Sequence, residues 1–244
     1  MLAATLQGVT RTYGSGPAAV PALREITLEI ACNCFTVLSG PSGSGKTTLL
    51  NLLGCLDQPD AGQVVVAGQA VQTWSDRALA DFRVRHLGFI FQSFNLIGVL
   101  SAYENIEYPL TLLGLPRRTR EARVNALLYA TGLEQHGARR PGELSGGQRQ
   151  RVAIARALVA EPSLVLADEP TANLDSATGQ EILALMRRLQ RQYATTFVFS
   201  SHDPHVLACA DHVLYLRDGQ IVADGMPHAS VTRASHVTTL EVQS

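Results

Sequence analysis

The chain has 244 residues, a length that suits one large α/β domain or two small lobes. Hydrophobic residues make up 46% of it and charged residues 17%, which excludes a disordered composition. The formal net charge of −1 argues against general binding to nucleic acid or anionic lipid, so we expect no nucleic-acid partner.

Signals for membrane insertion and for metal-binding cysteines are weak. Residues 1–10 have neither a basic start nor an apolar segment, and no stretch approaches the ~20 apolar residues that cross a bilayer. We therefore expect a soluble, cytosolic chain whose membrane role depends on a partner. Cys32 and Cys34 could suggest a metal or redox pair, but no second pair lies at zinc-finger spacing, so we interpret the cysteines as small hydrophobes in a reducing compartment. They are Cys32, Cys34, Cys55 and Cys209.

The periodicity of apolar residues predicts strands in several places. Residues 22–30 alternate apolar and polar side chains with one slip, which is typical of a half-buried antiparallel strand. The runs 35–38, 164–167 and 196–199 are apolar on both faces, as buried strands of a parallel sheet are. Residues 214–222 carry two apolar runs around Asp-Gly, which predicts a hairpin.

Residues 99–160 have a different character from the strand-rich regions around them. They contain helical patterns over 120–131 and 148–160, with turn signals at 114–116 and 141–142. We interpret this region as a helical lobe inserted into an α/β core.

A glycine-rich loop follows the first apolar run. Residues 40–47 match G-x-x-x-x-G-K-[ST] between a strand and a helix-like segment, which is the context that this motif requires. The alternative, a Gly/Ser loop with a surface lysine, does not explain that context. Lys46 would reach the β/γ-phosphates of ATP, and the Thr47 hydroxyl would ligate Mg²⁺. The backbone of the loop would wrap the phosphates, and its residues are Gly40, Pro41, Ser42, Gly43, Ser44 and Gly45, with Thr48 following Thr47.

Polar residues at the ends of other predicted strands add catalytic candidates. Asp168 would hold the Mg²⁺ shell, and Glu169 would orient and deprotonate the attacking water. Alone, an Asp-Glu pair could be an ordinary loop or cap, and the nearby phosphate loop favours the catalytic interpretation. His202 could reach the γ-phosphate at the same sheet edge, and Gln92 could touch Mg²⁺ or water. Neither would be persuasive in isolation.

A second helix start with phosphate-binding features lies about a hundred residues after the first. Residues 144–148 (LSGGQ) open the apolar helix QRQRVAIARALVA. The N–H groups and dipole at this start would face an anion, as in the phosphate loop. The residues concerned are Ser145, Gly146, Gly147 and Gln148.

With these motifs in this order, the chain resembles the nucleotide-binding domain of ABC ATPases from Leu6 to Gly225. The resemblance implies a single α/β domain over 1–225, with a P-loop NTPase (RecA-like) core and parallel sheet, an antiparallel β subdomain and an inserted α-helical subdomain. The core lobe would comprise about 1–95 and 162–225, the helical lobe about 96–161, and residues 226–244 a C-terminal tail. The motifs that carry the resemblance are Tyr13, GPSGSGKTT at 40–48, Gln92, LSGGQ at 144–148, LVLADEPT at 164–171, Asn173-Leu174-Asp175 and His202.

The resemblance also implies roles across a head-to-tail homodimer. Tyr13 would stack on adenine, and LSGGQ of one chain would close over the ATP of its partner. Asp175 would link the two sites across the interface. Because Lys46 and Glu169 are intact, an active ATPase is expected, with ATP and Mg²⁺ as its ligands.

Three stretches, at 49–64, 87–110 and 166–183, are most similar to the ATPases of the macrolide-efflux and lipoprotein-releasing group. This similarity implies an integral-membrane permease as partner, an extracytoplasmic adaptor in some systems, and a place at the cytoplasmic side of the inner membrane. Amino-acid importers share parts of these stretches, so an importer ATPase stays open. A non-transport ABC ATPase acting on DNA or ribosomes is disfavoured by the single motif set and the absence of heptads and paired CxxC.

Apolar residues between 92 and 116 are expected to form the docking groove for the permease. The alternative is that they belong to the core of the helical lobe. They are Phe94, Leu96, Ile97, Val99, Leu100 and Tyr103.

Overall fold

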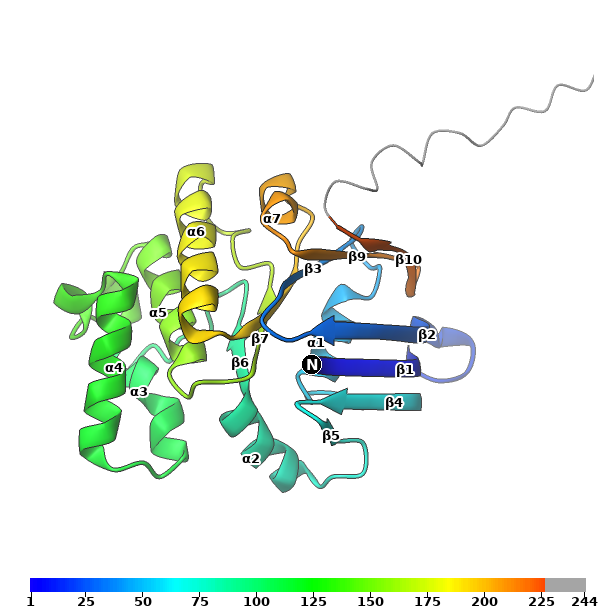
Figure 1. The fold of residues 1–244 in the computed structure, drawn as a ribbon, viewed down its shortest axis with the longest axis horizontal. Helices are drawn as coiled ribbons and strands as arrows, with labels where there is room; N and C mark the ends of the chain where they lie inside the picture. The colour runs from blue at the N-terminus through cyan, green and yellow to red at the C-terminus, as the bar shows by residue number, and fades with distance from the viewer. Residues whose placement is uncertain (227–244) are drawn as a thin grey trace, which may run out of the picture.

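Two β-sheets and a group of helices make up the computed structural model, which describes residues 1–226. Figure 1 shows α3 (Ala102–Leu112) and α4 (Arg117–Thr131) on the side of the molecule opposite β1 (Leu2–Tyr13) and β2 (Val20–Ala31). The predicted α/β class is confirmed, with parallel strands, an antiparallel sheet and a helical region in one chain.

The larger sheet has six strands in the order β10-β9-β3-β8-β7-β6. All neighbouring pairs from β9 to β6 are parallel, while β10 pairs antiparallel with β9 at one edge. The three runs predicted as buried parallel strands are β3, β7 and β8, and the predicted hairpin is β9–β10. The strands are β3 (Phe35–Ser39), β6 (Leu87–Ile90), β7 (Leu164–Asp168), β8 (Thr196–Ser200), β9 (His212–Arg217) and β10 (Gln220–Gly225).

The smaller sheet is antiparallel, in the order β2-β1-β4-β5, with β4 (Ala61–Val66) and β5 (Gln69–Ala70). The slip in the alternation of residues 22–30 is an irregularity in the pairing of β2 with β1. Val9 pairs with Ile26, but Arg11 pairs with Leu23, and Glu25 between them has φ of 49°. The extra residue restores the apolar face to the core after the slip.

Capping residues mark the ends of the two predicted helices. The predicted helix 148–160 is α5 (Gly146–Leu158), which starts earlier because the Ser145 hydroxyl accepts the Gln148 N–H. The predicted helix 120–131 is α4, which follows Pro116 and ends at Gly132 with φ of 69°. The remaining helical segments are α1 (Lys46–Leu53), α2 (Asp76–His86), α6 (Ser176–Tyr193), α7 (Pro204–Ala208), η1 (Gly16–Ala18), η2 (Glu134–His136) and η3 (Pro141–Glu143).

Two hydrophobic clusters lie on opposite faces of the larger sheet. Phe197 and Phe199 of β8 belong to the cluster with α3, α4, α5 and α6, while Val198 between them belongs to the cluster with α1, β1 and β2. Because successive side chains of a strand point to opposite faces, burial on both faces produces the continuous apolar runs seen in the sequence. The sheet is therefore packed against hydrophobic side chains on both of its faces.

Among residues 1–226, no helix combines the length and the apolar character that crossing a bilayer requires. The lobe boundaries proposed at about residues 95 and 161 stay a prediction. The tail proposed for 226–244 lies outside the described residues from 227 onward.

Candidate active site

A cavity of about 800 Å³ opens at the carboxyl ends of β3, β7 and β8. It collects candidates from distant parts of the chain, because parallel strands end at one edge of a sheet. The predicted site residues that line it are Tyr13, Gly40, Pro41, Ser42, Gly43, Gly45, Lys46, Thr47, Thr48, Gln92, Asp168, Glu169 and His202. Lining residues that sequence reasoning missed are Val20, Pro21, Ala22 and Ser39.

The glycine-rich loop passes so close to neighbouring backbone that side chains do not fit. A Cβ at Gly45, where φ is 103°, would lie 2.6 Å from the carbonyl oxygen of Ala22 in β2. A Cβ at Gly40 would lie 2.1 Å from the carbonyl oxygen of Leu216 in β9. Both contacts would be steric clashes, so the loop needs glycine at these positions.

The interior of the loop has groups that suit a phosphate. The Lys46 Nζ donates to the carbonyl oxygens of Gly40 and Pro41, each at 2.8 Å, which places the ammonium inside the loop. Helix α1 begins at Lys46 without a capping side chain, so its first N–H groups can donate to an anion. The buried Ser44 hydroxyl has no hydrogen-bond partner within residues 1–226. The loop therefore fits the polyphosphate of ATP.

Hard oxygen donors lie beside the loop. The Thr47 hydroxyl donates to Asp168 Oδ2 at 3.4 Å, which joins the start of α1 to the end of β7. Ser200, at the end of β8, donates to the other Asp168 oxygen through a short hydrogen bond. Hydroxyl and carboxylate oxygens are ligands that Mg²⁺ prefers. Thr47 and Asp168 thus fit the ion, and the only hint of Ser200 in the sequence was a polar residue ending an apolar strand.

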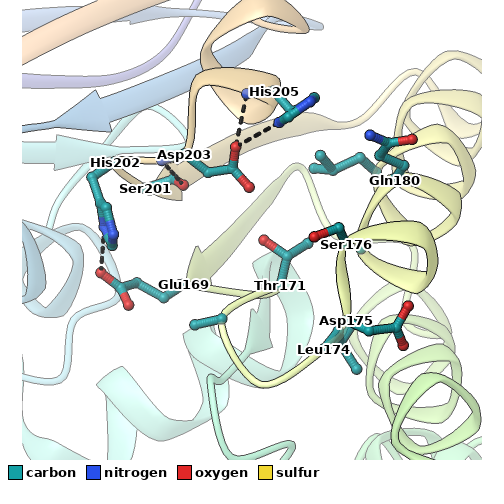
Figure 2. A pocket seen from close by; sticks show the side chains of 13 residues that line it. Glu169, Thr171, Leu174, Asp175, Ser176, Gln180, Ser201, His202, Asp203 and His205 are labelled. Carbon is teal, nitrogen blue, oxygen red and sulfur yellow. Dashed lines mark hydrogen bonds and ion pairs between the residues drawn. The ribbon is translucent and has the colours of Figure 1, made fainter.

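Glu169 stands between this donor pair and His202. Its Oε1 lies 3.4 Å from His202 Nδ1, and the His202 side chain is largely exposed. Both residues also line a smaller cavity of about 310 Å³ on the side of α6, which Figure 2 shows with their contact as a dashed line. The carboxylate therefore has one side toward the larger cavity and another toward the surface beside α6.

The residues of the LSGGQ segment do not line the larger cavity. Ser145 and Gln148 form a reciprocal capping box. The Gln148 nitrogen lies 3.2 Å from Ser145 Oγ, and the Ser145 nitrogen lies 2.9 Å from Gln148 Oε1. A Cβ at Gly147 would lie 2.7 Å from Thr178 Cγ2, so this helix start packs against the start of α6. Within one chain, the start of α1 therefore lies at the larger cavity, while the start of α5 lies outside it.

Asp175 caps α6 and lines the smaller cavity instead of the larger one. Its Oδ1 accepts the Thr178 N–H at 3.0 Å, and this bonding to Thr178 lowers the pKa of the Asp175 carboxyl. In Figure 2 Asp175 lies on the α6 side of the cavity, across from Glu169 and His202. Within one chain, Asp175 therefore acts as the N-cap of α6. Its predicted role in linking the two ATP sites across a dimer interface stays a prediction.

Two amides connect the cavity to other elements. The Asn173 side chain donates to the carbonyl oxygen of Gln92 at 3.0 Å, which ties the loop after β7 to the segment after β6. The buried Gln150 of α5 donates to the Pro170 carbonyl at 2.6 Å. The LSGGQ helix thus holds the backbone one residue beyond Glu169.

A separate groove of about 350 Å³ lies between α2, β6, α3 and α5, and its lining is mainly apolar. Of the six residues expected to form a docking groove, Ile97 lines it, while Leu96 and Tyr103 pack against the core. The expectation treated neighbours in sequence as one surface, whereas the groove draws on four elements, α2, β6, α3 and α5. Its principal lining residues are Val84, Leu87, Phe89, Phe91, Ile97, Tyr108, Pro109, Leu112, Ala157 and Ala160, with Arg83 and Arg156.

Comparison with known proteins agrees with the geometry of the cavity. Residues 23–172 match the family model described as ABC transporter. The lipoprotein-releasing system ATP-binding protein LolD of Chromohalobacter salexigens is 48% identical over 218 residues, which are 89% of this chain and 92% of that protein. A macrolide export ATP-binding/permease protein, MacB 1 of Yersinia pestis bv. Antiqua, is 44% identical over 96% of this chain. The chain spans 36% of that longer protein.

Solved structures show the same similarity. The dimeric post-hydrolysis state of an ATP-binding cassette bound to ADP and Pi superposes with a TM-score of 0.84 and 39% identity. The match covers 92% of this chain and 98% of that one. The structure of cbiO1 from Clostridium perfringens, part of the ABC transporter complex cbiONQ, also reaches a TM-score of 0.84, at 28% identity, and the match covers 93% of this chain and 89% of that one.

Proposed function

Because this chain belongs to the ABC transporter family, we propose that it is the ATPase subunit of a membrane transporter of the lipoprotein-release or macrolide-efflux type. The chain binds and hydrolyses ATP, as members of this family do. The observation that carries the proposal is the division of the site: Lys46, Thr47, Asp168 and Glu169 meet at one cavity, while LSGGQ opens elsewhere on the surface. A second copy would supply the missing part.

The cavity residues divide the hydrolytic work among them. The loop backbone and Lys46 would hold the β- and γ-phosphates, and Thr47, Asp168 and Gln92 would hold Mg²⁺, which neutralises phosphate charge. Glu169 would accept a proton from the attacking water, and His202 would contact the γ-phosphate. Tyr13 at the mouth of the cavity would stack on adenine.

Closure of the partner would complete the site. The exposed N-terminus of α5 would bring Ser145, Gly147 and Gln148 to the γ-phosphate of ATP held by the other chain. Gln150 and Pro170 offer a mechanical connection, because the same helix holds the segment beyond Glu169. ATP would thereby draw two chains together, and hydrolysis would release them.

The apolar groove between α2, β6, α3 and α5 is the proposed docking site for the permease. Tyr108 and Leu112 are exposed at its edge, and the cavity for ATP is connected to it through the segment after β6, which contains Gln92. A permease segment in this groove would respond to movement of Gln92. The chain would then lie at the cytoplasmic side of the cell membrane, with an extracytoplasmic adaptor as a further partner of the permease.

The decisive experiment isolates the complex in an ATP-bound state. Tagged Glu169→Gln would be purified from detergent-solubilised membranes of its native host with ATP and Mg²⁺, beside Lys46→Ala as the control that cannot hold ATP. We expect mass spectrometry to find a permease with few spans and a large extracytoplasmic domain. Recovery of a multi-span permease with a substrate-binding protein would instead assign the chain to an importer. Recovery of ribosomal or DNA-bound partners alone would overturn the transporter assignment.

A further inference from the structure

Tyr13 at the mouth of the ATP cavity is held by charged residues that the hydrolytic scheme does not use. Its hydroxyl donates to Asp57 Oδ2 at 2.7 Å. Arg11 forms ion pairs with both Asp57 and Asp60 at 2.7 Å, and its Nε donates to Asp57 at 3.0 Å. We call Arg11, Asp57 and Asp60 the Arg11 cluster.

Arg11 and Tyr13 are two residues apart on β1, so their side chains lie on the same face of the strand. The guanidinium carbon of Arg11 lies over the Tyr13 ring, 4.9 Å from its centroid. Tyr13 lines the cavity, whereas Arg11 does not. The cation therefore covers one face of the ring, and the ring is partly exposed toward the cavity.

The Arg11 cluster also joins the ring to the helix that carries the phosphate loop. Asp57 follows the end of α1, and its backbone N–H donates to the Asn51 carbonyl of that helix at 3.4 Å. Asp60 accepts the Thr12 N–H at 2.6 Å, so the end of β1 is tied to the same segment. This contact and Arg11 lower the pKa of the Asp60 carboxyl. Helix α1 thus relates the position of Tyr13 to that of Lys46.

We propose that Arg11 is a positioning residue for the purine subsite: with Asp57 it holds the Tyr13 ring as a fixed platform on which the base of the nucleotide stacks. The inference rests on the proposed function, because it takes the cavity as the ATP site and Tyr13 as its stacking residue. A ring held by a cation on one face and by its hydroxyl loses little freedom when a base binds the other face. Arg11 should therefore contribute to the binding of the base and not to the binding of the phosphates.

The test compares the Kd of ADP with that of inorganic pyrophosphate, because neither is hydrolysed and only ADP carries a base. Full-length Arg11→Ala, Tyr13→Ala and the double variant would be measured by calorimetry with Mg²⁺. We expect Arg11→Ala to raise the Kd of ADP about two- to fivefold, the effect of an exposed cation–π contact, and to leave that of pyrophosphate unchanged. Arg11→Lys should recover part of the loss.

The double variant separates positioning from a general structural effect. In the Tyr13→Ala background, Arg11→Ala should have no further effect on ADP, since no ring remains to be held. The matched control is Arg117→Ala, which removes an exposed ion pair with Glu121 on α4 and should change neither Kd.

Each contrary result has a distinct meaning. A rise of both Kd values in Arg11→Ala, or the same loss of ADP affinity with and without Tyr13, would overturn the positioning role and leave the ATP site standing. If Tyr13→Ala binds ADP as tightly as the unmodified chain, the stacking residue of the proposed function is wrong. If the unmodified chain binds neither ligand, the proposed site itself is wrong.

Discussion

Glu169 has a backbone φ of 42°, a value that side chains other than glycine rarely adopt. Its N–H donates to the carbonyl oxygen of Ser200 at 3.2 Å and to the Ser200 hydroxyl at 3.1 Å. The buried Ser200 also donates to Asp168, so one residue of β8 holds the Asp168 carboxylate and the Glu169 backbone. Local strain of this kind persists where neighbouring contacts hold it, and here the Glu169 carboxylate lies 3.4 Å from His202 Nδ1.

Replacing Glu169 by Gln removes the proton acceptor while keeping the shape of the side chain. We expect kcat for ATP hydrolysis to fall at least about a hundredfold, the lower range for loss of general-base catalysis. An ATP-bound dimer should then persist, and size-exclusion chromatography with ATP and Mg²⁺ measures it. Glu181→Gln, an exposed carboxylate on α6, is the control. A purely monomeric profile of Glu169→Gln would contradict the prediction.

The cysteines should differ in reactivity because their environments differ. Burial raises the pKa of the Cys55 thiol to about 11, whereas Cys209 is exposed. At pH 8 the raised pKa keeps Cys55 protonated, and the thiol is the unreactive form. Iodoacetamide should therefore modify Cys209 in the native chain and reach Cys55 only after unfolding. Peptide mass mapping checks this, and equal labelling rates would refute it.

Helix α5 packs against β6 at a position where only glycine fits. A Cβ at Gly88 would lie 2.3 Å from the carbonyl oxygen of Ala157. We expect Gly88→Ala to lower the free energy of unfolding by about 1–3 kcal/mol, because overpacking forces backbone shifts. Gly98→Ala is the matched control, since a Cβ there meets no atom within 4 Å. Urea unfolding compares them, and equal stabilities would show that α5 can move away without cost.

The apolar groove, and not the exposed face of α4, should be the surface on which permease docking depends. Leu112 lines the groove and is 57% exposed, while Tyr129 on α4 is 75% exposed and lies outside it. Leu112→Asp should abolish co-purification of the permease with this chain, because a carboxylate is costly in an apolar interface. It should leave the affinity for ATP unchanged. Tyr129→Asp should retain the permease. Loss in both variants would mean that docking does not depend on the groove.

For the whole molecule, the separation of the cavity from LSGGQ predicts complementation between defective chains. Lys46→Ala damages the phosphate loop, and Ser145→Arg places bulk at the exposed start of α5. Each variant alone should be inactive, since both sites of its homodimer contain the damage. Mixing equal amounts should restore about a quarter of normal activity, because half the dimers are mixed and each has one intact site. The ATPase rate at fixed total protein measures it, and no recovery would place both functions within one chain.

Much of this molecule could be predicted from the sequence because the signals are local. A buried parallel strand needs apolar side chains on both faces, so 35–38, 164–167 and 196–199 stand out without any structure. The glycine-rich loop is equally local, since its conformation and its chemistry reside in eight consecutive residues. Residues at the ends of parallel strands meet at one edge, and this alone brought Asp168 and His202 near Lys46.

Tertiary structure decided what depends on pairs distant in the chain. Arg11 and Asp57 are 46 residues apart, and Ser200 and Asp168 are 32 apart, so no periodicity links them. The burial of Leu96 and Tyr103 depends on which neighbour covers each side chain, and an apolar residue alone does not reveal it. Sequence by itself predicted β2, β3, β7, β8, the β9–β10 hairpin and helices α4 and α5, and it named the residues proposed for hydrolysis. Their faces and partners followed only from packing, because burial is a property of surfaces in contact and not of one segment.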